Sequence, residues 1–67
     1  MAHYYLSCDV SYLFEGEIET EVETAIVEAK SLAEAKKEQR KDILTEYGAD
    51  AKIHWDDVYR TSDDARL

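Results

Sequence analysis

Four glutamates recur at every second position of one segment, and their spacing is the strongest chemical signal in the chain. They are Glu17, Glu19, Glu21 and Glu23. Alternate residues of a β-strand project from one face about 6.6–6.8 Å apart, so these carboxylates would form a row. Glutamate is a poor strand former, and neighbouring like charges are destabilising. The row is therefore either a solvated face that also blocks edge aggregation, or an anionic surface for a basic partner.

Other residue types that could support catalysis or metal binding are not arranged for either. A row of carboxylates on a pleated face offers no dry pocket to raise one pKa for acid–base chemistry, and it does not converge on one cation. Cys8 falls on an apolar strand face and is interpreted as a small buried hydrophobe. His3 and His54 lack a fixed third ligand. We expect no enzyme activity, no catalytic residues, no metal and no cofactor.

The chain has a strongly negative net charge, and its charged residues are unevenly distributed. The 67 residues include 16 acidic and 8 basic side chains, which gives a net charge of −8. Residues 1–29 contain no lysine or arginine, and every basic residue lies from Lys30 onward. Such a balance repels nucleic acid and anionic membranes and attracts basic proteins. We expect the partner to be a basic protein surface, such as that of a nucleic-acid-binding host enzyme, without direct contact to nucleic acid or membrane.

Length and composition predict one folded domain over residues 1–67. Hydrophobic residues make up 45% of the chain, which is typical of a globular protein. The apolar stretches are far shorter than the ~20 residues that span a bilayer, and no basic-then-apolar leader is evident. The single Cys8 suits a reducing compartment. We therefore expect a cytoplasmic protein (in the host cytoplasm if phage-encoded) that is a monomer or homodimer.

Two strands open the chain. Residues 3–14 and residues 17–28 both alternate between apolar and polar side chains with period two. Pairing the apolar face of the first strand with the apolar face of the second requires a three-residue loop at 14–16, which also suits Gly16. Tyr12 then meets Ile18 and Cys8 meets Val22. In this register Asp9 lies across from Glu21 and close to Glu23.

A helix and a third strand follow. Ser31 and Glu34 form a capping box and Gly48 is a helix stop, which together predict a helix over 32–47. Lys36 points near the centre of its apolar sector and is interpreted as snorkelling. Residues 51–60 predict a strand with Ile53 and Trp55 facing inward. We expect a break or bulge at residues 56–57 and an acidic tail over residues 61–67.

The predicted architecture is an α+β fold with element order β-β-α-β. A crossover through the helix gives a three-stranded antiparallel sheet of order 3-1-2, with the helix on one face. The other face stays open, and the preferred register places the glutamate row there. The candidate partner-binding residues are Asp9, Glu17, Glu19, Glu21, Glu23, Tyr5, Asp56 and Asp57.

Residues 26–60, with the sequence IVEAKSLAEAKKEQRKDILTEYGADAKIHWDDVYR, resemble a strand–[Ser/Thr]-Leu-x-Glu-Ala–helix–strand unit of small acidic phage-encoded inhibitors. These include a phage inhibitor of bacterial RNA polymerase and some anti-CRISPR proteins. The resemblance covers about half the chain and consists largely of the capping box. It implies a stoichiometric inhibitor that mimics nucleic acid in a basic groove of a host enzyme. No diagnostic motif matches, so no functional residue is carried over. The alternative is a homo-oligomeric domain of unknown role, joined through a strand edge, which the expected charge favours, or through the uncovered sheet face.

Overall fold

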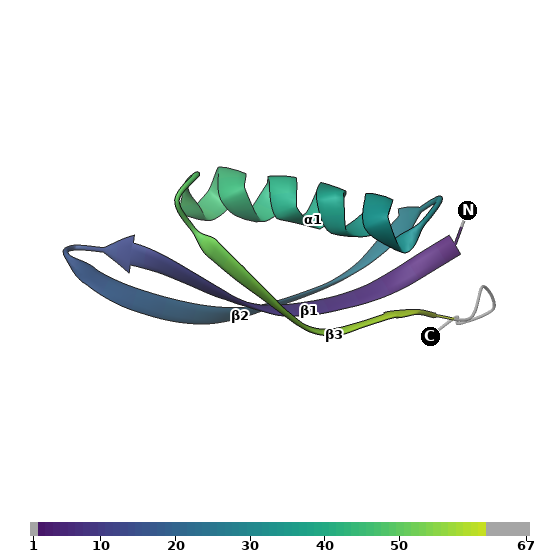
Figure 1. Cartoon of the computed structure of the whole chain (residues 1–67), viewed down its shortest axis with the longest axis horizontal. Helices are drawn as coiled ribbons and strands as arrows, with labels where there is room; N and C mark the ends of the chain where they lie inside the picture. Colours follow the sequence, from purple (N-terminus) through teal and green to yellow (C-terminus); the bar gives the residue numbers. More distant parts are fainter. Residues whose placement is uncertain (1, 62–67) are drawn as a thin grey trace.

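The computed structural model describes residues 2–61, which form three strands and one helix in the order β-β-α-β (Figure 1). They are β1 (Ala2–Phe14), β2 (Glu17–Ala29), α1 (Leu32–Tyr47) and β3 (Lys52–Arg60). The strands form one antiparallel sheet of order β2-β1-β3. The predicted fold class, topology and helix bounds are confirmed, and the strand bounds shift by one residue. The predicted tail lies outside the described residues from residue 62 onward.

Helix α1 begins and ends where its capping residues predict. The Ser31 hydroxyl accepts a hydrogen bond from the Glu34 backbone N–H at 3.2 Å, and the Glu34 carboxylate accepts one from the Lys30 N–H at 3.3 Å. At the other end, Gly48 has φ of 111° and donates its N–H to the Leu44 carbonyl at 2.9 Å. The chain then leaves the helix for β3.

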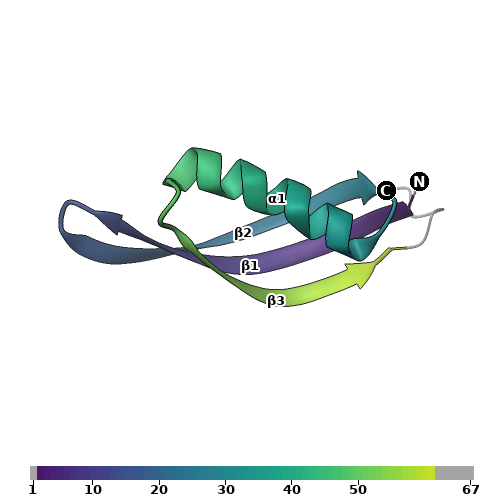
Figure 2. The ribbon, with the colours of Figure 1, turned by 45° about the horizontal axis from the view of Figure 1, so that its top comes forward.

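The core lies between α1 and one face of the sheet, which the turned view shows as two layers (Figure 2). Central strand β1 contributes most of it. Its alternate residues Leu6, Cys8 and Val10 are each at most 1% exposed. Ala35 and Ile43 of the helix pack against them. Alternation in β1 therefore predicts its buried face correctly.

The helix covers only part of the sheet. Sixteen helical residues span about 24 Å, whereas a 13-residue strand spans about 43 Å. The β1–β2 hairpin therefore projects as an arm beyond the C-terminal end of α1 (Figure 1). The resulting molecule is elongated, with principal extents of 44 × 18 × 16 Å. We refer to the sheet face that packs on α1 as the helix side, and to the opposite face as the open face.

Strand β3 contains the predicted bulge. Leu6 pairs with Val58 while Cys8 pairs with Trp55, so the register shifts between them. Asp56 and Asp57 both fall in the intervening stretch and are exposed. In a regular strand Trp55 and Val58 would point to opposite faces. The extra residue at the bulge shifts the alternation by one position, so both side chains pack against the core.

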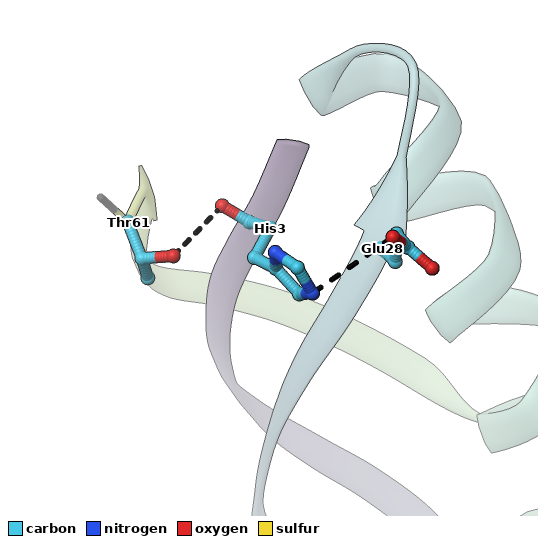
Figure 3. A network of polar contacts seen from close by, with 3 residues as sticks. All are labelled: His3, Glu28 and Thr61. Carbon is cyan, nitrogen blue, oxygen red and sulfur yellow. Dashed lines mark hydrogen bonds and ion pairs between the residues drawn. The ribbon is translucent and has the colours of Figure 1, made fainter. Parts of the chain in front are cut away.

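The end of the sheet farthest from the arm is tied together by polar contacts (Figure 3). The backbone N–H and hydroxyl of Thr61 donate to the His3 carbonyl at 2.9 and 3.1 Å. The His3 Nε2 atom lies 4.0 Å from the Glu28 carboxylate. These contacts join the end of β3 to β1 and β1 to β2.

Candidate functional site: two faces of the β1–β2 hairpin

The hairpin turn has two residues rather than the three predicted. Phe14 pairs directly with Glu17, which leaves Glu15 and Gly16 as the loop. Their φ angles are 52° and 83°, and a type I′ turn requires positive φ at both central residues. The turn suits the right-handed twist of the strands, but it requires Glu15 to adopt a left-handed backbone conformation. The predicted three-residue loop is therefore wrong.

This turn reverses the predicted relation between the two strands. Tyr12 pairs with Glu19, Val10 with Glu21 and Cys8 with Glu23. Directly paired residues project from the same face, so the glutamates share a face with the core residues of β1. The prediction that they lie on the uncovered face is wrong. Asp9 pairs instead with Val22.

The physical reason is that one row of β2 changes character along its length. Positions 17, 19, 21 and 23 are glutamates, but the same row continues as Ala25, Val27 and Ala29. Ala29 is 1% exposed, and Val27 packs on the same cluster. The apolar part of the row lies under α1 and the acidic part lies on the arm. The same face of β2 therefore carries both the apolar part and the acidic part of the row, because the helix is shorter than the strand.

The acidic row, defined as Glu17, Glu19, Glu21 and Glu23, is open to solvent along most of its length. The first three are exposed and Glu23 is half-buried. No ion pair joins any of the four to a lysine within residues 2–61. Beside the row stand Tyr12 and Phe14 of β1, and Phe14 is 57% exposed. The arm thus presents a line of carboxylates next to aromatic rings.

Tyr47 joins the end of α1 to the base of the acidic row. Its phenol donates a hydrogen bond of 2.5 Å to the Glu23 carboxylate, and its ring lies 4.8 Å from that of Tyr12. The bond to Glu23 raises the pKa of the Tyr47 phenol well above its usual range, and partial desolvation adds to the effect. The pKa of Tyr12 is also raised, first by desolvation and then by Glu21 and Glu19. Both phenols stay protonated at neutral pH.

The remaining reactive groups do not form a catalytic arrangement. Burial raises the pKa of the Cys8 thiol, and the charges of Glu23 and Asp9 raise it further, which disfavours the nucleophilic thiolate. Within residues 2–61 no three His, Cys, Asp or Glu side chains come together in a way that could hold a metal. The Lys36 ammonium lies 5.7 Å from the centre of the Trp55 ring, a cation–π contact on the helix side.

The open face carries three apolar residues of β2 that the predicted register places in the core. Ile18, Val22 and Ile26 of β2 are 76%, 68% and 57% exposed. Leu13 pairs with Ile18 at the arm and is 72% exposed. The Tyr5 and Tyr59 rings stack at 5.1 Å near the other end. The change from Glu23 to Ala25 in the other row was the signal in the sequence that these residues face outward.

The predicted partner-binding residues do not form one surface. Only Glu17, Glu19, Glu21 and Glu23 lie together. Asp9 lies on the open face, where its partners are Val22 and His54. Tyr5 lies on that face as well, while Asp56 and Asp57 lie at the bulge of β3, at the opposite edge of the sheet from β2.

No protein-family model, curated protein or solved structure matches this chain. None of the helical segments within residues 2–61 has the length and apolar character needed to span a bilayer.

Proposed function

We propose that this protein is a non-catalytic binding module whose acidic row occupies a basic surface of another protein. The observation that supports this proposal is that Glu17, Glu19 and Glu21 stand exposed on the arm beyond the end of α1. They lie beside the exposed ring of Phe14 and the half-buried ring of Tyr12. Tyr12 pairs with Glu19 and Phe14 with Glu17 on the same face. Aromatic residues supply contact area in interfaces, while carboxylates steer a basic partner into place.

The row carries a conformational and electrostatic cost that an ordinary solvated face would avoid. Glutamate disfavours strands, and these side chains repel one another without a lysine partner within residues 2–61. A basic partner would relieve that repulsion on binding. The cost is therefore offset only in the complex, which supports a binding role over a purely solubilising one.

The proposed partner is a nucleic-acid-binding protein, whose basic groove would take the row in place of a phosphate backbone. The carboxylates repeat about every 6.7 Å along the strand, about half the charge density of one DNA strand at ~3.4 Å per phosphate. The arm would therefore fill part of such a groove and act as an inhibitor by exclusion. This role agrees with the resemblance to small phage-encoded inhibitors and with a cytoplasmic site of action.

The test is affinity purification from a bacterial lysate with the full chain as bait at low salt. We expect a basic protein that elutes as salt rises and that added duplex DNA displaces. Reversing Glu19 and Glu21 to lysine should abolish its capture, because the central charges of the row become repulsive.

A matched control reverses Glu38 and Asp42 of α1 to lysine. Both are exposed, and the change in net charge is the same. Capture should survive in this variant if the position of the row matters. Equal loss of capture in both variants would show that net charge, not the position of the row, is responsible. Capture that resists both high salt and the Glu19/Glu21 reversal would reject the proposal.

A further inference from the structure

We propose that the open face is a homodimer interface, on which a second copy of the chain packs sheet against sheet. Its apolar residues follow the whole length of β2 and continue onto β1 and β3. They are Tyr5, Leu13, Ile18, Val22, Ile26 and Tyr59, and four of the six are 57–76% exposed. Tyr59 is 54% exposed. Extended apolar patches on a soluble, highly charged domain are typical of protein contacts.

The pattern of β2 on this face is self-complementary. Read outward from Val22, the face presents Thr20 and Thr24, and then Ile18 and Ile26. A two-fold axis through Val22 would set Val22 over its own copy, and each isoleucine over the other isoleucine of the second chain. Because Asp9 pairs with Val22, the same axis would also set Asp9 over its own copy. A symmetric dimer requires one patch to match itself in this way, and aligned sheets pack about 10 Å apart.

Charge favours this face over the β2 edge for self-association. Strands β1 and β2 place only Asp9 and Glu28 among acidic residues on the open face, and Glu28 lies 4.0 Å from His3. Pairing two copies along the β2 edge would instead bring their acidic rows side by side. Face-to-face packing keeps both rows on the outer surfaces, so it is compatible with the proposed binding of a basic partner and independent of it.

The size of the open face is also comparable to that of a dimer interface. It extends along a molecule whose principal extents are 44 × 18 × 16 Å. A specific interface buries roughly 800 Å² on each partner, which is the order of area that a face of this length and width offers. The apolar residues named above would form the centre of such an interface, and the serine, threonine and charged side chains of the same face would complete it.

Charged side chains on the open face oppose the packing. They include Lys52, which pairs with Ser11, and Asp9, which supplies a test. Asp9 is exposed near the middle of the open face, with His54 as its neighbour on β3. Burying its carboxylate in a dimer is unfavourable. Replacing Asp9 with asparagine should therefore tighten the dimer, an effect that a folding defect cannot imitate.

The experiment is sedimentation equilibrium of the full chain over a range of concentrations, at low and high salt. We expect a dimer that strengthens as salt rises, because salt screens the repulsion between two chains of net charge −8. Val22→Lys should raise the dissociation constant by at least about tenfold. Asp9→Asn should lower it. The matched control, Thr45→Lys, adds the same single charge at an exposed position of α1, away from the open face, and should leave the dimer intact.

Three results would overturn the proposal. The first is a wild-type chain that remains monomeric at every concentration. The second is a dimer that withstands Val22→Lys, which would indicate edge pairing. The third is a dimer that weakens with salt and with Glu21→Lys, which would indicate docking of the acidic row on the basic side of α1 at Lys37, Arg40 and Lys41. The first two results leave capture of a basic partner untouched, so the two proposals can fail separately. The third would mean that the acidic row binds the chain's own α1.

Discussion

The phenol of Tyr47, the last residue of α1, donates a hydrogen bond to the Glu23 carboxylate in β2. This contact lies where the covered part of the sheet ends and the arm begins. It gives the half-buried carboxylate a donor, and it holds the end of the helix against the hairpin. The base of the acidic row is therefore anchored, while Glu17, Glu19 and Glu21 remain exposed.

Removing the Tyr47 hydroxyl should loosen this junction. In Tyr47→Phe the Glu23 carboxylate loses its donor, but the ring can still pack against Tyr12. We expect a small decrease in the free energy of unfolding in urea, and faster amide hydrogen exchange around Glu23 and Leu44. Glu23→Gln keeps an acceptor and should retain more of the stability. A Tyr47→Phe protein with unchanged stability and exchange would show that the bond contributes nothing.

Alkaline pH should destabilise the fold. The pKa of Tyr47 is raised in the folded state, chiefly by the bond to Glu23, so the folded chain holds this proton more tightly than the unfolded chain. The stabilisation that comes from the raised pKa of Tyr47 is complete below the unfolded pKa of about 10 and is lost as pH rises through the folded pKa. Urea unfolding at several pH values should show stability falling above about pH 10. Tyr47→Phe should reduce the slope without abolishing it, since Tyr12 and Cys8 also have raised pKa values.

The turn should respond to substitutions that change only backbone preference. Glu15 has φ of 52° and Gly16 has φ of 83°, and a Cβ at Gly16 would meet no atom within 4 Å. Gly16→Ala should destabilise the protein by roughly 1–2 kcal/mol, because an L-residue disfavours the left-handed region. Glu15→Asn should stabilise it, by up to about 1 kcal/mol, because asparagine tolerates this region.

Glu15→Gln is the control for the turn, since it removes the same charge without the conformational preference of asparagine. Thermal unfolding of the four proteins would provide the comparison. If Glu15→Gln stabilised the chain as much as Glu15→Asn, charge rather than turn geometry would be the cause. Stability unchanged by Gly16→Ala would contradict the two-residue turn.

Replacing part of the acidic row should make the isolated protein more stable. Threonine favours strands and carries no charge, so Glu19→Thr with Glu21→Thr should add a few tenths of a kcal/mol for each substitution. The gain should shrink at high salt, because screening already weakens the repulsion. Urea unfolding at two salt concentrations measures both effects. A loss of stability, or a gain independent of salt, would mean that repulsion within the row is negligible.

The kinds of element and their limits could be predicted from local patterns. Period-two alternation defined β1 and β2, while Ser31 and Gly48 set the ends of α1 to the residue. The Asp56-Asp57 pair predicted the irregularity in β3. These features depend on interactions between residues close in the chain, which is why sequence alone determines them.

The register of the hairpin could not be decided in the same way. Alternation divides each strand into two rows, but it does not say which row of β2 shares a face with the core row of β1. A loop shorter by one residue exchanges the rows. Matching apolar with apolar favoured a three-residue loop, whereas the structure pairs Tyr12 with Glu19.

The tertiary structure made that choice because α1 covers only about half of the sheet. Ala25, Val27 and Ala29 must face the helix to close the core, and the same row carries the four glutamates onto the arm. The sequence thus determined that an acidic row and an apolar row exist in β2. Which row lies beside the helix was decided only by the packing of α1 on part of the sheet. That packing places the acidic row on the helix side and Ile18, Val22 and Ile26 on the open face.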